Sequence, residues 1–470
     1  MMSGGSGPKK TGVEENGYEI NTGGPTVHAR RIKGRFRNIK WLIMGLIYLP
    51  LFILPYISWG DRPAILWDIP NRKFYFFEMT LWPQDLLVLA IILLFCFMLL
   101  IAMTVIAGRI FCGFVCPQTI WVDIMTWIEQ KVEGGAAKRI KLDNSPWNAN
   151  KIIRRGGKHV LFLSFCAFTA IHVVAYFSGI WDLYAGLAAF DLRGAEWITL
   201  GSIIITCYVG TSLMREQFCM WICPYARIQA VCADKDTQVV AYDYHRGEQR
   251  GKMTKGKIAE GNGDCIDCNL CVVTCPTGVD IRQGQQIGCI NCGICADACD
   301  SVMSKIHLPR GLIRFASTHE IDEDVKVKYP YLKTRPVFYG VITFLSVVAI
   351  IYSLATRTVM EIYVSHERSP LYTLMSDGSI QNRYHLDILN KTEYPADLVV
   401  SIAGIDGLTS NVDDYVFHLK SAQVKKFVLQ ARVPDRLLTK EIQPVTITLR
   451  SQSNPDVNDV YQSQFIGPKK

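Results

Sequence analysis

Eight of the sixteen cysteines fall into two runs that share one spacing. Each run reads C-x2-C-x2-C-x3-C, and together they comprise Cys265, Cys268, Cys271 and Cys275, then Cys289, Cys292, Cys295 and Cys299. Where cysteines have this spacing around two clusters, the fourth cysteine of each run binds the other cluster. We therefore expect two [4Fe–4S] clusters. Their ligands would be Cys265, Cys268, Cys271 and Cys299 for one cluster, and Cys289, Cys292, Cys295 and Cys275 for the other.

Zinc is the alternative metal, because structural zinc sites also use C-x2-C pairs. A zinc site needs two such pairs, whereas each run here has three closely spaced cysteines and a fourth further on. The doubled run therefore favours iron–sulfur clusters. Pro276 follows the first run, and Asp300 stands at that place after the second. Two such clusters exchange single electrons and offer no substrate site, so the segment predicts a ferredoxin-type relay.

A second cysteine motif also occurs twice. Residues 111–117 and 218–224 both read F-C-x3-C-P, with Arg109 or Arg215 shortly before each motif. The candidate catalytic and metal-binding residues are Cys112, Cys116, Cys219 and Cys223. Thiolates select Cu(I), zinc or iron–sulfur centres, so we expect these cysteines to bind copper or to help hold a further redox centre. The alternative is that they are small buried apolar residues, which is a common role of cysteine.

The sequence leaves the geometry of each of these pairs open. On a helix, positions i and i+4 share a face, so that both sulfurs could bind one soft ion. Proline, however, disfavours helical backbone angles at the residue before it, so Cys116 and Cys223 could instead close a turn. Either geometry brings the two sulfurs of a pair together.

The elements that position these motifs are long apolar stretches. Hydrophobic residues make up 49% of the 470 residues and charged residues 20%. Five stretches have the roughly 18 or more mostly apolar residues that can span a bilayer: 41–60, 86–108, 160–181, 197–214 and 336–356. Each F-C-x3-C-P motif follows an even-numbered stretch, so the first four spans resemble two copies of a hairpin that ends in a cysteine pair. The segment after Pro117 has apolar residues at helical spacing with charges between them, and we expect it to lie along the membrane interface.

Lysine and arginine are dense before the first stretch and between the second and third, and sparse in the first and third connections. Because basic loops stay in the cytoplasm, this pattern places the N-terminus and residues 215–335 inside and residues 357–470 outside. The net charge of +8 is thereby explained, so no nucleic-acid partner is expected. The chain has neither a P-loop nor a G-x-G-x-x-G motif, so nucleotide chemistry has no support.

The last hundred residues change character. Short alternating runs at 371–374, 385–389, 398–402, 424–429 and 445–449 are separated by turn residues such as Asp377-Gly378. This pattern predicts an all-β, immunoglobulin-like sandwich. The predicted fold class is thus an α-helical membrane protein with an inserted ferredoxin-type domain and a C-terminal sandwich. The expected division is a disordered basic N-terminus (1–38), a four-helix membrane domain (39–215), a cytoplasmic ferredoxin-type domain (216–335), a fifth transmembrane helix (336–356) and the outer sandwich (357–470).

This order of parts resembles the cytochrome c oxidase accessory proteins called CcoG, FixG or RdxA. The resemblance runs from about residue 30 onward and is carried by Gly108-Arg109-Ile110-Phe111-Cys112, Cys116-Pro117, the second F-C-x3-C-P motif and the doubled cysteine run. The stretches 368–372 and 377–382 are also similar to the start of that family's outer domain. The four-span part is similar to the NapH and NosR electron-transfer proteins as well.

The resemblance implies a multi-pass protein of the bacterial inner membrane with its sandwich in the periplasm. It further implies a role in building the copper-containing cbb3-type oxidase, with reduction of Cu(II) to Cu(I) as the activity. Oxidase subunits or copper-delivery proteins would be its partners and membrane lipid its surroundings, while the electron donor is not identified. Two alternatives stay open at this point: a quinol-coupled relay to another reductase, and a non-enzymatic assembly scaffold.

Overall fold

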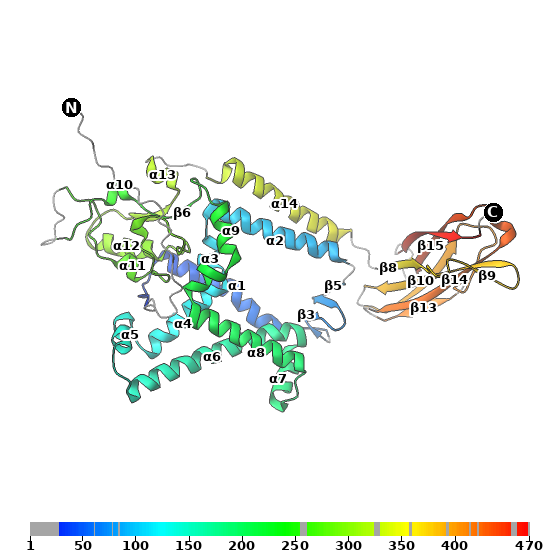
Figure 1. The fold of residues 1–470 in the computed structure, drawn as a ribbon, viewed down its shortest axis with the longest axis horizontal. Helices are drawn as coiled ribbons and strands as arrows, with labels where there is room; N and C mark the ends of the chain where they lie inside the picture. The colour runs from blue at the N-terminus through cyan, green and yellow to red at the C-terminus, as the bar shows by residue number, and fades with distance from the viewer. Residues whose placement is uncertain are drawn as a thin grey trace.

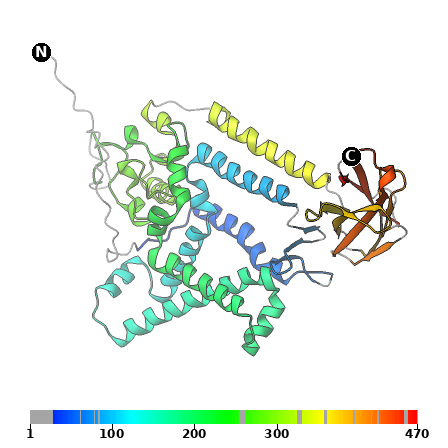
Figure 2. The same ribbon diagram turned by 45° about the vertical axis from the view of Figure 1, so that its right-hand side comes forward.

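The computed structural model describes residues 28–468, apart from 61, 78, 83–84, 254–260, 324–329, 357–359, 392–393, 413–414, 421–422 and 453–457. Long helices lie between a cysteine-rich domain at one end and a β-sandwich at the other (Figure 1). The disorder expected for residues 1–27 lies outside the described residues. Two of the long helices, α2 (Leu86–Ala107) and α14 (Thr334–Ala355), run side by side (Figure 2).

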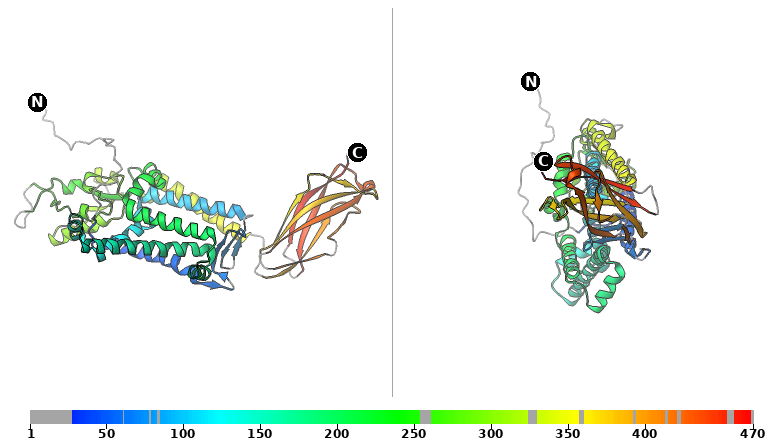
Figure 3. Two further views of the ribbon diagram at one scale, coloured as in Figure 1. Left: turned by 60° about the horizontal axis from the view of Figure 1, so that its bottom comes forward. Right: turned by 90° about the vertical axis from the view of Figure 1, so that its right-hand side faces the viewer.

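The helical part extends along the long axis of the molecule (Figure 3). Its remaining helices are α1 (Arg35–Ile53), α3 (Ile110–Phe114), α4 (Pro117–Val132), α5 (Ala136–Asp143), α6 (Ala149–Ser178), α7 (Ile180–Ala189), α8 (Gly194–Tyr208) and α9 (Pro224–Cys232), with π-helical turns at Val209–Met214 and Phe218–Ile222. Within the described chain, six helical segments are long and apolar enough to cross a membrane. Five of them overlap the stretches that hydropathy predicted, and the sixth is Ile110–Val132.

This sixth segment differs from the interfacial helix that we expected. It is broken at Cys116, whose backbone is extended (φ −58°, ψ 127°) before Pro117 begins α4. Two of the three charges on α4 are shielded from water, whereas Lys131 is exposed. Asp123 accepts hydrogen bonds from Arg37 of α1 at 2.6 and 2.7 Å, and Glu129 accepts one from Arg139 of α5 at 2.7 Å. Alternating charges and apolar residues suggested an exposed face, but cations from other helices cover Asp123 and Glu129.

The N-terminal segment also differs from the expectation of disorder up to residue 38. Helix α1 already begins at Arg35, and residues 28–34 lie on the cysteine-rich domain, where Arg30 donates its backbone N–H to Val273 at 2.8 Å. The first N–H groups of a helix need acceptors. Asp297 provides them from about 260 residues away, at 3.1 Å from the N–H of Phe36 and 2.9 Å from that of Arg37. The order of this segment therefore depends on tertiary contacts.

The ferredoxin-type domain is built around an antiparallel pair, β6 (Val239–Tyr242) with β7 (Ile313–Ala316). Its helices are α10 (Tyr244–Gly247), α11 (Leu270–Val273), α12 (Ile294–Lys305) and α13 (Thr318–Asp322). Helix α9, which follows the predicted boundary at residue 216, packs on α2. Tyr225 of α9 shares a 3.1 Å hydrogen bond with Thr104 of α2 and donates another, at 3.2 Å, to the Leu100 carbonyl.

The predicted sandwich is confirmed. One sheet has the order β12-β14-β10-β8 with β9 beside β10, and the other has the order β13-β11-β15-β16. The strands are β8 (Met360–His366), β9 (Thr373–Leu374), β10 (Ser379–Asn390), β11 (Ala396–Ala403), β12 (Thr409–Ser410), β13 (Val416–Leu419), β14 (Val424–Pro434), β15 (Ile442–Ser451) and β16 (Asn458–Ile466). Tyr384, Phe417 and Phe465 are fully buried between the sheets.

Short strands that hydropathy did not predict connect α1 to α2 at the sandwich end of the helices. They are β1 (Ser58–Trp59), β2 (Arg62–Pro63), β3 (Ile65–Asp68), β4 (Lys73–Phe76) and β5 (Met79–Leu81). Asp85, just before α2, lies 2.9 Å from the ammonium of Lys391, which also lies 2.8 Å from Glu361 of β8. An ion cluster thus joins the sandwich to the start of α2.

Candidate functional site: two cluster cavities and a paired thiol motif

Two cavities in the ferredoxin-type domain are each lined by four cysteines. The first has an empty volume of about 370 Å³ and is lined by Cys265, Cys268, Cys271 and Cys299. The second, of about 350 Å³, is lined by Cys275, Cys289, Cys292 and Cys295. We call them cavity I and cavity II. Each takes three cysteines from one run and the fourth from the other, which is the grouping that the crossed ligand assignment requires.

Residues in the left-handed backbone region shape the two loops. Asp267 and Asn269 have φ of 50° and 57° in the first loop, and Asn291 and Gly293 have φ of 52° and 69° in the second. Asparagine and glycine adopt this conformation more readily than most residues do. The repeated tight turn brings three cysteines of one run to the wall of one cavity.

The donor sets fit [4Fe–4S] clusters better than single ions. Among the described residues, no group of three or more His, Cys, Asp or Glu side chains converges closely enough to hold one metal ion. A tetrahedral zinc site requires such convergence, whereas a four-iron core keeps its ligand sulfurs further apart. Burial raises the pKa of the Cys292 thiol to about 12. A cationic iron core would therefore be needed to hold this sulfur as a thiolate at neutral pH.

The structure also explains why Asp300 replaces the proline of the first run. Cys299 and Asp300 lie inside α12, which continues to Lys305, and a proline inside a helix removes a hydrogen bond and clashes with the preceding turn. The Asp300 carboxylate accepts a hydrogen bond from the N–H of Gly311 at 2.9 Å. Pro276, by contrast, follows the end of α11, where no helix has to continue.

Both F-C-x3-C-P motifs have the same local structure. The first cysteine lies in a short helical turn, Cys112 in α3 and Cys219 in the turn Phe218–Ile222. The second cysteine is extended, with ψ of 127° at Cys116 and 113° at Cys223, and the proline after it starts a helix. The turn geometry therefore holds at the second cysteine of each pair, as expected for a residue before proline.

The two motifs meet in space. The Cys219 thiol interacts electrostatically with Cys116 and Cys223, and the Cys112 thiol interacts with Cys116 and Cys219. Burial, followed by the neighbouring thiols Cys116 and Cys223, raises the pKa of Cys219 to about 12. The Cys112 sulfur also donates to the side-chain oxygen of Gln229 at 3.3 Å. Four thiols from segments a hundred residues apart thus gather in one buried region.

Equivalent positions of the two motifs contact the cavity II loop. Gly113 follows Cys112, and a β-carbon on Gly113 would lie 2.7 Å from the Ile290 carbonyl oxygen and 2.9 Å from the Cys292 Cα. Met220 follows Cys219, and its methyl group would lie 2.7 Å from a β-carbon on Gly288. The thiol motifs therefore sit against the backbone that carries the ligands of cavity II.

Arg109 holds these parts together. Its guanidinium donates to the Ile287 carbonyl of the cavity II loop and, at 2.9 Å, to the Ala226 carbonyl of α9. Its positive charge acts on Cys289, Cys219 and Cys112. The sequence indicated Arg109 only as a neighbour of the first motif, because both of its acceptors lie more than a hundred residues away.

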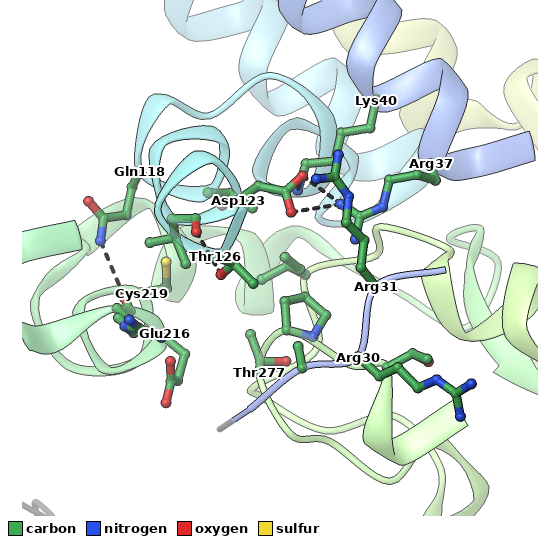
Figure 4. Close-up of a pocket in the computed structure, with 17 residues that line it drawn as sticks. Arg30, Arg31, Arg37, Lys40, Gln118, Asp123, Thr126, Glu216, Cys219 and Thr277 are labelled. Atoms are coloured by element: carbon green, nitrogen blue, oxygen red, sulfur yellow. Dashed lines mark hydrogen bonds and ion pairs between the residues drawn. The ribbon is translucent and has the colours of Figure 1, made fainter. Parts of the chain in front are cut away.

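A pocket with an empty volume of about 560 Å³ opens beside Cys219 (Figure 4). Pro276, Thr277 and Ile290 line it from the side of cavity II, and residues of α1, of α4 and of the N-terminal segment line it from the other sides. Figure 4 shows Cys219 and Glu216 on one side and Arg31 and Arg37 on the other. This pocket borders both Cys219 and the wall of cavity II.

Family models match three parts of the chain. Residues 214–318 match a "4Fe-4S dicluster domain", residues 89–133 match a "4Fe-4S binding domain", and residues 350–468 match the "IG-like fold at C-terminal of FixG". The second match includes the first thiol motif. These models support the two [4Fe–4S] clusters and the C-terminal sandwich.

The chain is similar to known proteins over most of its length. The chain is 36% identical to the nitrogen fixation protein FixG of Rhizobium meliloti, over 82% of this chain and 80% of FixG. It is 35% identical to protein RdxA of Cereibacter sphaeroides, over 82% of this chain and 84% of RdxA. A crystal structure of a FixG-related protein from Vibrio parahaemolyticus aligns over 24% of this chain and 99% of its own, with 19% identity and a TM-score of 0.22.

Proposed function

Because the chain belongs to the FixG and RdxA family, we propose that this membrane-bound iron–sulfur electron-transfer protein reduces Cu(II) to Cu(I) during maturation of a cbb3-type cytochrome c oxidase. The two [4Fe–4S] clusters supply electrons one at a time. In this proposal the thiols act as two pairs, Cys112 with Cys116 and Cys219 with Cys223, which bind copper or help to hold a further redox centre. Oxidase subunits or copper-delivery proteins receive the product.

The contact between the thiol motifs and the cavity II loop carries the proposal. Gly113 and Met220 both pack on residues 288–292, which include two proposed cluster ligands, Cys289 and Cys292. A cluster held in cavity II would supply one electron, and Cu(II) would take it and become Cu(I). Because burial raises the pKa of the Cys219 thiol, the binding of copper to this sulfur as a thiolate would release a proton. Soft thiolates then favour the Cu(I) product over Cu(II).

In this proposal the protein lies in the inner membrane, with its thiols and clusters on the cytoplasmic side and its sandwich in the periplasm. The cysteine-rich domain and the sandwich lie at opposite ends of the helices, which supports this orientation (Figure 1). The basic residues of the N-terminus and of residues 109–158 also favour the cytoplasm. Thiols stay reduced there, as the site requires.

The test mixes the anaerobically purified, cluster-reduced protein with Cu(II). Cluster reoxidation is followed by optical absorption while a chelator captures Cu(I). The test variant carries Cys112→Ser, Cys116→Ser, Cys219→Ser and Cys223→Ser. The control variant carries Cys96→Ser and Cys232→Ser, two thiols outside the motifs and the clusters. We expect matched cluster bleaching and Cu(I) formation in the control and their loss in the test variant.

Clusters that stay reduced in the presence of Cu(II) would contradict this function. Reoxidation of the clusters by a quinone under the same conditions would then support the quinol-coupled relay. Normal oxidase assembly by the four-serine variant would also contradict the copper site.

A further inference from the structure

The pocket beside Cys219 has a strongly asymmetric charge. Five basic side chains line it and only two acidic ones, Asp123 and Glu216; the basic residues are Arg30, Arg31, Arg37, Lys40 and Arg215. Asp123 is already paired with Arg37 at 2.6 Å and lies 3.5 Å from the ammonium of Lys40. Burial raises the pKa of Glu216.

Among the described residues, two of these cations form no direct ion pair, although the charge of Arg31 also interacts with Asp123. Arg215 is paired with Glu129, which lies behind the pocket wall. For Arg30 and Arg31, no ion pair with a carboxylate of the described residues exists; Arg31 instead lies over the ring of Trp41, with its guanidinium carbon 5.0 Å from the ring centroid. The pocket therefore has an excess positive charge from the segment before α1.

Tertiary contacts fix that segment on both sides. The N–H of Arg30 is held by the Val273 carbonyl at 2.8 Å, and the carbonyl of the preceding Ala29 accepts a hydrogen bond from Arg139 at 3.0 Å. His28 contacts Asp143 at 2.7 Å. The backbone of this segment is thus held at the pocket, whereas the Arg30 side chain is exposed and its guanidinium points away from Cys219 (Figure 4).

Such a pocket does not suit a hydrated Cu²⁺ ion. Like charges repel, whereas a site lined with one sign of charge raises the local concentration of the opposite one. A small complex in which carboxylates or thiolates outweigh the charge of the metal would instead be attracted. It would also reach Cys219 and the Pro276–Thr277 wall of cavity II together.

We propose that this pocket binds Cu(II) as a small anionic complex and so selects the form of copper that is reduced. This inference rests on the proposed function and adds its substrate class. Cys275, Cys289, Cys292 and Cys295 would hold the cluster of cavity II, which would supply the electron to Cu(II) in the bound complex. The cluster is oxidised by one electron, the copper is reduced by one, and no bond to the ligand breaks in that step.

The test compares two complexes of copper with full-length, cluster-reduced protein. Cu(II)–nitrilotriacetate carries one net negative charge, and Cu(II)–bis-glycinate is neutral. We expect Arg30→Gln with Arg31→Gln to raise KM for the anionic complex by roughly tenfold and to change KM for the neutral one by less than about twofold. The matched control is Lys33→Gln with Arg35→Gln, which removes two exposed cations of the same segment that do not line the pocket. It should leave both KM values unchanged.

A redox-silent probe separates this inference from the proposed function. Zn(II)–nitrilotriacetate has the same net charge as the copper complex, and its binding is measured by calorimetry. Binding that weakens in the Arg30/Arg31 variant and at high salt supports the pocket even if no copper is reduced, an outcome that would overturn only the proposed function. Equal KM values for both copper complexes, unaffected by the Arg30/Arg31 variant, would overturn the pocket and leave the reductase standing.

Discussion

Gly113 packs directly on Cys292: a β-carbon on the glycine would lie only 2.9 Å from the cysteine Cα. This contact joins a thiol motif after the second membrane helix to a cluster loop about 180 residues later. No side chain fits between the two backbones. The same loop contacts Met220 of the second motif at Gly288, so both motifs are positioned by one part of the ferredoxin-type domain.

Gly113→Ala should uncouple the thiols from the clusters. The new methyl group would collide with the Ile290 carbonyl and the Cys292 backbone, both below 3.0 Å. Because neither is a flexible side chain, the loop has to move. We expect copper-dependent reoxidation of the clusters to slow by about tenfold or more, since a displacement of about 1 Å at a reacting site can cost about a hundredfold. Stopped-flow absorption measures this rate. Gly45→Ala, where nothing lies within 4 Å, is the control, and an equal effect of both would contradict the coupling.

Cys275→Ser and Cys299→Ser should remove different clusters. With crossed ligands, loss of Cys275 affects cavity II and loss of Cys299 affects cavity I. Each variant should keep about half of the iron and one cluster signal in electron paramagnetic resonance. The cluster that remains shows how the ligands are paired. If the ligands are crossed, Cys275→Ser keeps the cluster of cavity I. The reduction potential of that cluster should then change when Arg282→Gln is added, because Arg282 lines cavity I. If the reduction potential of the remaining cluster in Cys275→Ser instead changed when Arg109→Gln was added, the ligands would not be crossed.

Arg109→Gln should lower the reduction potential of the cavity II cluster. Burial raises the pKa of Cys289, and the positive charge of Arg109 offsets part of that rise. The same charge would stabilise the more negative, reduced cluster. A charge interaction of about 1–2 kcal/mol corresponds to roughly 40–90 mV for one electron. Redox titration should show this shift in the reduction potential of the cavity II cluster and none in that of the cavity I cluster. Arg109→Lys keeps the charge, so an equal shift in that variant would contradict the electrostatic cause.

Asp297→Ala should destabilise the start of α1. The carboxylate accepts the N–H groups of Phe36 and Arg37, and removal of a helix cap costs about 1–2 kcal/mol. Thermal unfolding of the detergent-solubilised protein measures the loss. Asp297→Asn keeps one acceptor oxygen and should therefore lose less stability than Asp297→Ala. Gly34→Ala should act through the same contact, because its β-carbon would overlap the Asp297 side chain. An unchanged unfolding temperature in both Asp297 variants would show that the cap contributes nothing to the stability of the protein.

Lys391→Met should loosen the sandwich from the helical part. The lysine side chain is 2% exposed and lies between the carboxylates of Asp85 and Glu361. Its removal leaves two like charges close together, and breaking a buried ion pair in this way costs about 3–5 kcal/mol. We expect faster protease cleavage between α14 and β8. Adding Asp85→Asn should restore part of the resistance, and a double variant as labile as Lys391→Met would contradict the ion-cluster explanation.

The sequence by itself determined the parts of this protein and their order. Cysteine spacing, long apolar stretches and alternating short runs are local patterns, set by the geometry of one loop, helix or strand. They predicted the two clusters, five of the six apolar helices and the sandwich. They also indicated the F-C-x3-C-P cysteines as candidates, because two copies of one motif stand out in a single chain.

The tertiary structure alone decided how these parts act on one another. It gathered Cys112 and Cys116 with Cys219 and Cys223, placed Gly113 on the cavity II loop, and covered the charges of α4 with cations from other helices. It also ordered residues 28–34 and turned Arg30 and Arg31 into a pocket wall. Most of these contacts join residues tens to hundreds of positions apart. Such contacts depend on how side chains pack in three dimensions, and no local spacing along the chain encodes them.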